Sequence, residues 1–191
     1  PAIVETVMVA MAEIKARGGT VSFDPNVRAE LFGDLGVSRA LASVMQQTDL
    51  FLPSGDELYL FADQRDETAA IGELLSRGVT AVVLKRGAKG CIVYDGDIPD
   101  DLEQGIVGKG FPIEIYNVLG AGDAFMSGFL RGWLKGEQHS TSATWANACG
   151  AFAVSRLLCA PEYPTWTELT HFLEHGSKHR ALRKDDDLNH I

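Results

Sequence analysis

The 191-residue sequence predicts an α/β fold in which helices cover both faces of a mostly parallel sheet. Segments of strand-like composition alternate along the chain with segments whose apolar residues recur at helical spacing. Residues 79–85 (VTAVVLK) form a continuous β-branched and apolar run, which is typical of an interior strand. Because such sheets bind ligands at the carboxyl ends of their strands, the loops that follow strands are the expected positions of functional residues.

The individual segments follow this alternation in order. We expect helices over residues 3–17, 37–47, 66–77, 122–135, 140–157 and from Thr165 to about residue 175, and strands over 20–24, 49–53, 79–85, 91–95 and 111–117. The Gly- and Asp-rich stretch 96–110 predicts a hairpin or a loop. Without repeats or low-complexity linkers, one domain is expected over residues 1–176, followed by a charged tail at 177–191.

Composition and charge exclude several classes of protein. Apolar residues make up 46% and charged residues 23% of the chain, as in ordinary folded proteins. A net charge of −9 argues against a nucleic-acid partner, since phosphate neutralisation needs a basic surface. No apolar run approaches the ~20 residues that span a bilayer. The odd set of three cysteines and the lack of a secretory start predict a cytoplasmic protein.

The segment from Asn117 to Gly128 (NVLGAGDAFMSG) carries the strongest chemical signal. Three small residues, Gly120, Ala121 and Gly122, stand where an expected strand gives way to an expected helix. Such a helix start exposes backbone N–H donors with partial positive charge, which suits a phosphate group. Asp123 lies in the first helical turn, where its carboxylate could accept a proton from a hydroxyl. The alternative interpretation is an ordinary helix cap in a tight turn.

This segment resembles the C-terminal signature of the PfkB/ribokinase family of carbohydrate kinases. The resemblance implies a ribokinase-like three-layer α/β/α sandwich that uses ATP and Mg²⁺. It also implies that Gly120, Ala121 and Gly122 form an anion hole and that Asp123 is the catalytic base. Many members have Asp-Thr where this chain has Asn117-Val118. That pair helps to bind a monovalent cation, so the resemblance does not extend to potassium activation.

Residues 85–90 (KRGAKG) join two expected strands. One interpretation is a turn with solvated basic side chains. The other is a loop that contacts nucleotide phosphates through backbone and cationic groups. The family resemblance favours the second interpretation and assigns nucleotide binding to Lys85, Arg86, Gly87 and Gly90.

Two further segments follow expected strands. Residues 24–28 (DPNVR) resemble an Asp-x-Asn-x-Arg segment of sugar kinases, which implies that Asp24, Asn26 and Arg28 face phosphate or substrate; a simple helix-starting turn is the alternative. Residues 54–57 (SGDE) occupy the place of the family's Asn-x-x-Glu, so Glu57 would hold Mg²⁺ through water. Ser54 and Glu57 also have the spacing of a capping box, and both roles are compatible.

The helix that contains Asn147 borders the adenine pocket in this family, so the resemblance implies a nucleotide contact there. The motifs as a group are most similar to those of kinases acting on keto-deoxy sugar acids. This implies 5-dehydro-2-deoxygluconate, an acid of inositol catabolism, as the substrate. Kinases of 2-keto-3-deoxygluconate are the enzymatic alternative, and a non-catalytic nucleotide-binding module is the alternative from another class.

The resemblance begins after the family's N-terminal part, which normally supplies a lid and most sugar contacts. We therefore expect a piece of a longer protein that is weakly active or inactive by itself. Members of the family often dimerise through the lid, so a homodimer of the intact protein is possible under this resemblance. No membrane partner is expected.

Overall fold

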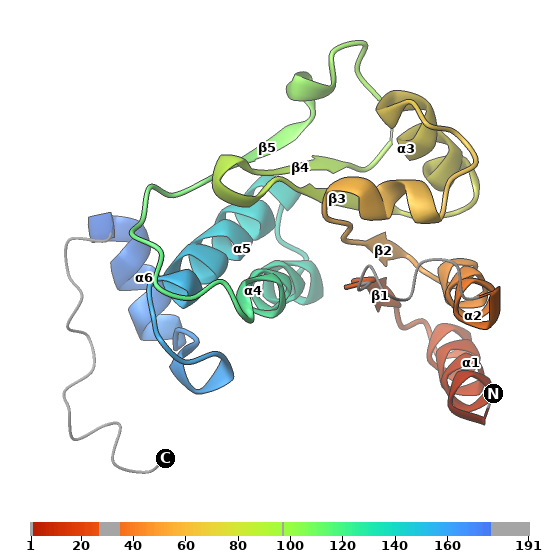
Figure 1. Ribbon diagram of the computed structural model, residues 1–191, viewed down its shortest axis with the longest axis horizontal. Coiled ribbons are helices and arrows are strands. Elements are labelled where there is room, and N and C mark those ends of the chain that lie inside the picture. Colours follow the sequence, from red (N-terminus) through yellow and green to blue (C-terminus); the bar gives the residue numbers. More distant parts are fainter. Residues whose placement is uncertain (1, 27–34, 97, 177–191) are drawn as a thin grey trace. The chain divides into compact units, whose positions relative to one another are not determined.

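The computed structural model describes residues 2–26, 35–96 and 98–176. The described residues form two compact units, one within residues 2–87 and 91–107 and the other within residues 88–90 and 108–176, whose helices and strands are labelled in Figure 1. The longer helices of the first unit are α1 (Ala2–Ala16), α2 (Leu35–Met45) and α3 (Glu67–Ser76). Those of the second unit are α4 (Ala121–Lys135), α5 (His139–Val154) and α6 (Trp166–His175). The expected helices are thus confirmed, with ends that differ by a few residues.

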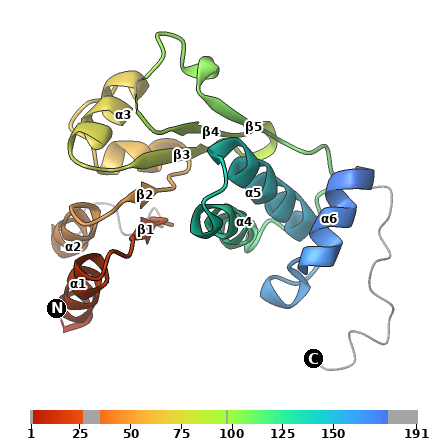
Figure 2. The ribbon, with the colours of Figure 1, turned by 180° about the vertical axis from the view of Figure 1, so that it is seen from behind.

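Five strands form one sheet in the order β1-β2-β3-β4-β5 (Figure 2). They are β1 (Ser22–Phe23), β2 (Leu50–Phe51), β3 (Ala81–Lys85), β4 (Gly90–Tyr94) and β5 (Ile106–Lys109). β1 pairs with β2 and β2 with β3 in parallel, whereas β3 and β4 are antiparallel. The predicted α/β class with a mostly parallel sheet is confirmed. The carboxyl ends of β1, β2 and β3 therefore meet at one edge of the sheet.

The core of the first unit lies around β2 and β3. Leu50 and Phe51 of β2 and residues 81–84 of β3 are buried, as the apolar run predicted for β3. Phe51 contacts Phe23 and Phe61, with ring centroids 5.9 and 5.3 Å apart. The Phe51–Phe61 pair is edge-to-face, and this geometry adds to the stabilisation from the area that the rings bury. This packing fixes the ends of β1 and β2, and hence the loops that follow them.

In the second unit, α4 and α5 approach each other closely because glycines face the contact. A Cβ atom at Gly128 would collide with the backbone of Trp145, and one at Gly132 would collide with Ser142. Ala146 and Ala148 on α5 are fully buried. The close packing holds the start of α4 on a rigid pair of helices.

The predicted strand over residues 111–117 is wrong. β5 lies earlier, at Ile106–Lys109, inside the stretch expected to be a hairpin or loop. The amides of Tyr116 and Asn117 donate to the Val154 carbonyl at the end of α5, at 2.8 and 3.2 Å, and not to a neighbouring strand. Phe111 and Ile113 pack on the buried cluster of α5 and α6. The apolar residues of 111–117 are thus used for packing on helices and not for strand pairing.

The predicted boundary at residue 176 stays a prediction, because residues 177–191 lie outside the described residues. No helix in the described part of the chain has the length and apolar character to span a membrane.

Candidate active site

At the carboxyl ends of β1, β2 and β3, the structure brings together three segments that the sequence singled out. Lys85, the last residue of β3, donates from Nζ to Asp24 Oδ2 at 2.6 Å. The Lys85 amide donates to the Pro53 carbonyl at 2.9 Å, and Ser54 and Lys85 form a parallel bridge. Asp24 follows β1 and Ser54 follows β2, so parallel pairing accounts for the cluster.

Arg86 follows Lys85, but its guanidinium is engaged elsewhere in the first unit. It pairs with Glu67 at 3.1 Å and with Glu103. Burial alone would lower the pKa of Arg86, but the hydrogen bond and charge of Glu103, with Tyr94 and Glu67, raise it above its ordinary value. This side chain links the start of α3 to the turn before β5.

The glycines of the Gly87–Gly90 turn serve different needs. Gly90 has a φ of 91°, and a Cβ there would collide with the backbone of Gly108 and Gly110. Gly90 is therefore required for close approach of two chain segments. Gly87 has a φ of 56°, and a Cβ there would meet nothing within 4 Å. The backbone at Gly87 is thus the more accessible part of this turn.

Glu57 forms the capping box that its spacing predicted. Its Oε2 accepts the Ser54 amide at 2.7 Å at the start of the 3₁₀ helix Gly55–Leu60. Carboxylate oxygens are ligands that suit Mg²⁺, either directly or through a metal-bound water. The residue present therefore fits the role expected for Mg²⁺.

The start of α4 is built by its flanking turns. Gly120 is the N-cap, with a left-handed φ of 81°, and supplies no side-chain acceptor to the first helical turn. Asn117 fixes the preceding turn: Oδ1 accepts the Leu119 amide at 3.0 Å and Nδ2 donates to the Leu157 carbonyl at 2.8 Å. The Ala121 amide donates to the Val118 carbonyl at 3.2 Å. The amides of Gly122 and Asp123 are the remaining first-turn donors that helix geometry directs outward.

Asp123 is exposed at this helix start. Within the described part of the chain, its carboxylate takes part in no ion pair or hydrogen bond. The partial positive charge of the helix start stabilises a carboxylate at this position. Asp123 is thus an available proton acceptor beside backbone donors, as a phosphoryl-transfer base requires.

Tyr163 is a residue of this region that the sequence did not reveal. Its hydroxyl donates to the Gly120 carbonyl at 2.6 Å across 43 positions of sequence. Burial, and then the negative charge of Asp123, raise the pKa of Tyr163. A Cβ at Gly120 would collide with this hydroxyl oxygen. Tyr163 lies in a stretch without a recognisable spacing rule, so only the fold identifies it.

The other predicted residues are placed as follows. Asn147 is 7% exposed and donates from Nδ2 to the Ala143 carbonyl of its own helix at 2.9 Å. Asn26 is exposed and adopts a positive φ of 41°, a conformation in which Asn is enriched. Arg28 lies outside the described residues.

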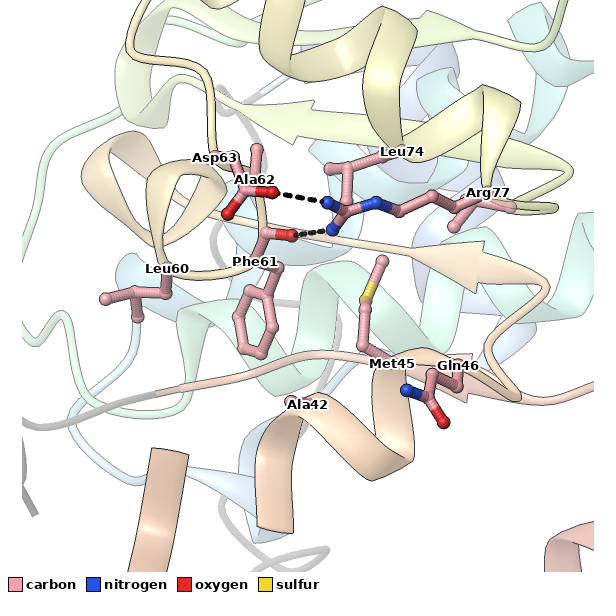
Figure 3. A pocket seen from close by; sticks show the side chains of 10 residues that line it. Ala42, Met45, Gln46, Leu60, Phe61, Ala62, Asp63, Leu74 and Arg77 are labelled. Atoms are coloured by element: carbon pink, nitrogen blue, oxygen red, sulfur yellow. Dashed lines mark hydrogen bonds and ion pairs between the residues drawn. The ribbon is translucent and has the colours of Figure 1, made fainter. Parts of the chain in front are cut away.

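A cavity of about 500 Å³ lies in the first unit, beside α2 and α3 (Figure 3). Met45, Phe61 and Leu74 provide apolar walls. Arg77 lies at its rim and donates to the Phe61 carbonyl at 3.0 Å and to Asp63 at 2.8 Å. The sequence assigned no function to these residues. The Arg77 guanidinium is already engaged with the Phe61 carbonyl and with Asp63.

The structure thus combines a mostly parallel α/β sheet whose strand ends carry polar residues with a glycine-capped helix that carries an exposed Asp. The chain belongs to the pfkB family of carbohydrate kinases, whose pattern matches residues 1–166. It is therefore a member of a sugar-kinase family, as its motifs indicated.

Relatives within the family differ in their named substrates. The chain is 30% identical over 172 residues to a fructokinase of Vibrio alginolyticus, covering 86% of this chain and 54% of that protein. It is 28% identical over 164 residues to a 2-dehydro-3-deoxygluconokinase of Bacillus subtilis, covering 85% and 49%. The chain thus spans about half the length of the curated relatives it matches.

A solved structure supports the fold. An E. coli protein described as a ribokinase II, in complex with ATP and Mg²⁺, superposes with a TM-score of 0.81 at 31% identity. The match covers 90% of this chain and 54% of that one. The ribokinase-like fold is confirmed.

Proposed function

We propose that the intact protein transfers the γ-phosphoryl group of ATP to a hydroxyl of a keto-deoxy sugar acid. Membership of the carbohydrate kinase family supports phosphoryl transfer to a sugar. The observation that carries the proposal is the exposed Asp123 carboxylate, which no described side chain or amide engages, in the first turn of α4. At this position, a general base can reach a substrate hydroxyl without first breaking an ion pair.

In the proposed mechanism, Asp123 accepts the proton of the substrate hydroxyl, and that oxygen attacks the γ-phosphorus in line. The O–P bond to the acceptor forms as the bond to the ADP oxygen breaks, and ADP leaves with the electron pair. The amides of Gly122 and Asp123 donate to oxygens of the transferring group, where negative charge is distributed. Gly120 permits the left-handed cap that directs these amides outward.

Lys85 and the backbone at Gly87 are the proposed phosphate contacts of the first unit. Glu57 would hold Mg²⁺ through water, and the ion would neutralise phosphate charge. We assign no nucleotide contact to the side chains of Arg86 and Asn147, because the first is held by Glu67 and Glu103 and the second is buried in its own helix.

For the acceptor, we propose 5-dehydro-2-deoxygluconate, which would make the protein a 5-dehydro-2-deoxygluconokinase. The segments 24–28 (DPNVR) and 85–90 (KRGAKG) support a sugar acid. The similarity to a 2-dehydro-3-deoxygluconokinase favours 2-keto-3-deoxygluconate as the second candidate. Both acids present hydroxyls for phosphorylation and a carboxylate for recognition by a cationic side chain.

The test is acceptor-dependent ADP release by the intact protein with MgATP and each of three acceptors: the two acids and fructose. We expect kcat/KM to be at least tenfold higher for 5-dehydro-2-deoxygluconate than for the others. A preference for either alternative would replace the proposed substrate. Nucleotide binding without turnover on any acceptor would instead indicate a non-catalytic nucleotide-binding module.

A further inference from the structure

The Asp24–Lys85 ion pair joins the ends of two strands across 61 positions of sequence. The two side chains are only 9% and 11% exposed, and Nζ lies 2.6 Å from Oδ2. β2 lies between β1 and β3 in the sheet, so the pair crosses over the end of the middle strand. Its position depends on the sheet and not on local sequence.

The geometry of this ion pair does not favour a large contribution to the stability of the fold. The second carboxylate oxygen, Oδ1, is buried and has no hydrogen-bond partner among the described residues. A buried acceptor without a donor keeps its full desolvation penalty, and buried ion pairs often stabilise no more than apolar side chains of similar volume. Fold stability therefore gives no reason for two charges at this place.

The lysine retains binding capacity. An ammonium group has three N–H donors, and the one hydrogen bond of Lys85 Nζ within the described chain goes to Asp24. The neighbouring cation, Arg86, is held by Glu67 and Glu103. Gly87 follows with open space around its Cα. Lys85 is thus a cation at the carboxyl end of β3 that has N–H donors left for an anionic ligand.

We infer that Asp24 is a positioning residue, which holds the Lys85 ammonium so that its remaining donors bind a phosphate group of the nucleotide. This inference rests on the proposed function. A lysine side chain is flexible and would lose much of its freedom on binding a phosphate. The carboxylate immobilises it beforehand, so less entropy is lost when the nucleotide binds.

The test compares ADP with adenosine, because only ADP carries phosphates. Titration calorimetry on the intact protein, without sugar, measures both affinities. For Asp24→Asn we expect ADP to bind about tenfold more weakly and adenosine to bind as in the wild type. Asp63→Asn is the matched control, since it removes a carboxylate from an exposed ion pair of the same unit, and both affinities should stay unchanged.

A double variant keeps the test decisive if the single change impairs folding. Asp24→Leu with Lys85→Met replaces the pair by apolar side chains, and should retain the wild-type Tm while losing ADP affinity at least tenfold. An ADP affinity within twofold of wild type in either variant would overturn the inference. So would a parallel loss of ADP and adenosine, which indicates a purely structural role. A wild-type protein that binds neither ligand would instead contradict the proposed function.

Discussion

The two regions implicated in the proposed reaction use their charged groups in opposite ways. At the strand ends of the first unit, Asp24 engages Lys85, Arg86 engages two glutamates, and Glu57 accepts a backbone amide. At the start of α4 in the second unit, Asp123 is exposed and outside every ion pair of the described chain. The first arrangement fixes side chains in place, which suits binding. The second leaves a carboxylate ready to exchange a proton, which suits catalysis.

The largest effect should follow the loss of that carboxylate. We expect Asp123→Asn to lower kcat at least ~100-fold, because an amide cannot accept the proton. The control variant Asp100→Asn, in an exposed loop, should leave kcat unchanged. Circular dichroism and ADP affinity should be normal in both proteins, since Asp123 contributes no described contact to the fold. Turnover near the wild-type rate would exclude Asp123 as the base.

The backbone that presents Asp123 should be the next most sensitive feature. Gly120→Ala places a side chain at a φ of 81° and against the Tyr163 hydroxyl. The left-handed strain costs about 1–2 kcal/mol, and displacement of Tyr163 adds to it. We expect turnover to fall roughly tenfold or more, since small misplacements of catalytic groups are costly.

Gly136 at the other end of α4 provides the matched comparison. It has a φ of 69°, but a Cβ there meets nothing within 4 Å. Gly136→Ala should lower the free energy of unfolding by about 1–2 kcal/mol and leave kcat unchanged. Equal effects of the two substitutions on kcat, measured beside urea unfolding curves, would show that the contact with Tyr163 is unimportant.

The two tyrosines extend the comparison to alkaline pH. Burial raises the pKa of Tyr94 from 10.0 to about 12, while Arg86 lowers it and nearby carboxylates raise it. Because the folded-state value is the higher one, the stabilisation is present below pH 10.0 and is lost as the pH rises through about 12. The loss should be at most about 2.7 kcal/mol, since one pKa unit corresponds to about 1.36 kcal/mol.

Urea unfolding between pH 9 and 12 measures this loss. Tyr94→Phe should not show this alkaline loss of unfolding free energy, whereas Tyr163→Phe, in the second unit, should still show it. An identical pH profile in wild type and Tyr94→Phe would contradict the assignment.

The smallest effect is expected at Arg86. Arg86→Gln removes pairs with Glu67 and Glu103, whose side chains are 35% and 70% exposed, so the free energy of unfolding should fall by less than about 1 kcal/mol. ADP affinity should stay within about twofold, in contrast to Lys85→Gln, which should weaken it strongly. A large loss of ADP affinity in Arg86→Gln would show that the guanidinium leaves its glutamates when nucleotide binds.

Several features of this protein were predictable because their causes are local. The helix start at Ala121 follows from small residues and a first-turn Asp, and the capping boxes at Ser54 and Thr165 follow from a glutamate three positions later. The apolar, β-branched run 79–85 is typical of an interior strand, and β3 (Ala81–Lys85) lies within it. These local patterns also sufficed for the family resemblance and for placing Asp123 in the first turn of α4.

Tertiary structure alone decided how those groups pair. The sequence assigned Lys85 and Arg86 the same role, but the ion pairs separate them, because the sheet brings Asp24 to one and the α3 and 102–104 segments bring glutamates to the other. It also decided that residues 111–117 pack on helices, and that Tyr163 secures Gly120. Contacts over 40 or more positions depend on chain topology, which side-chain periodicity does not encode.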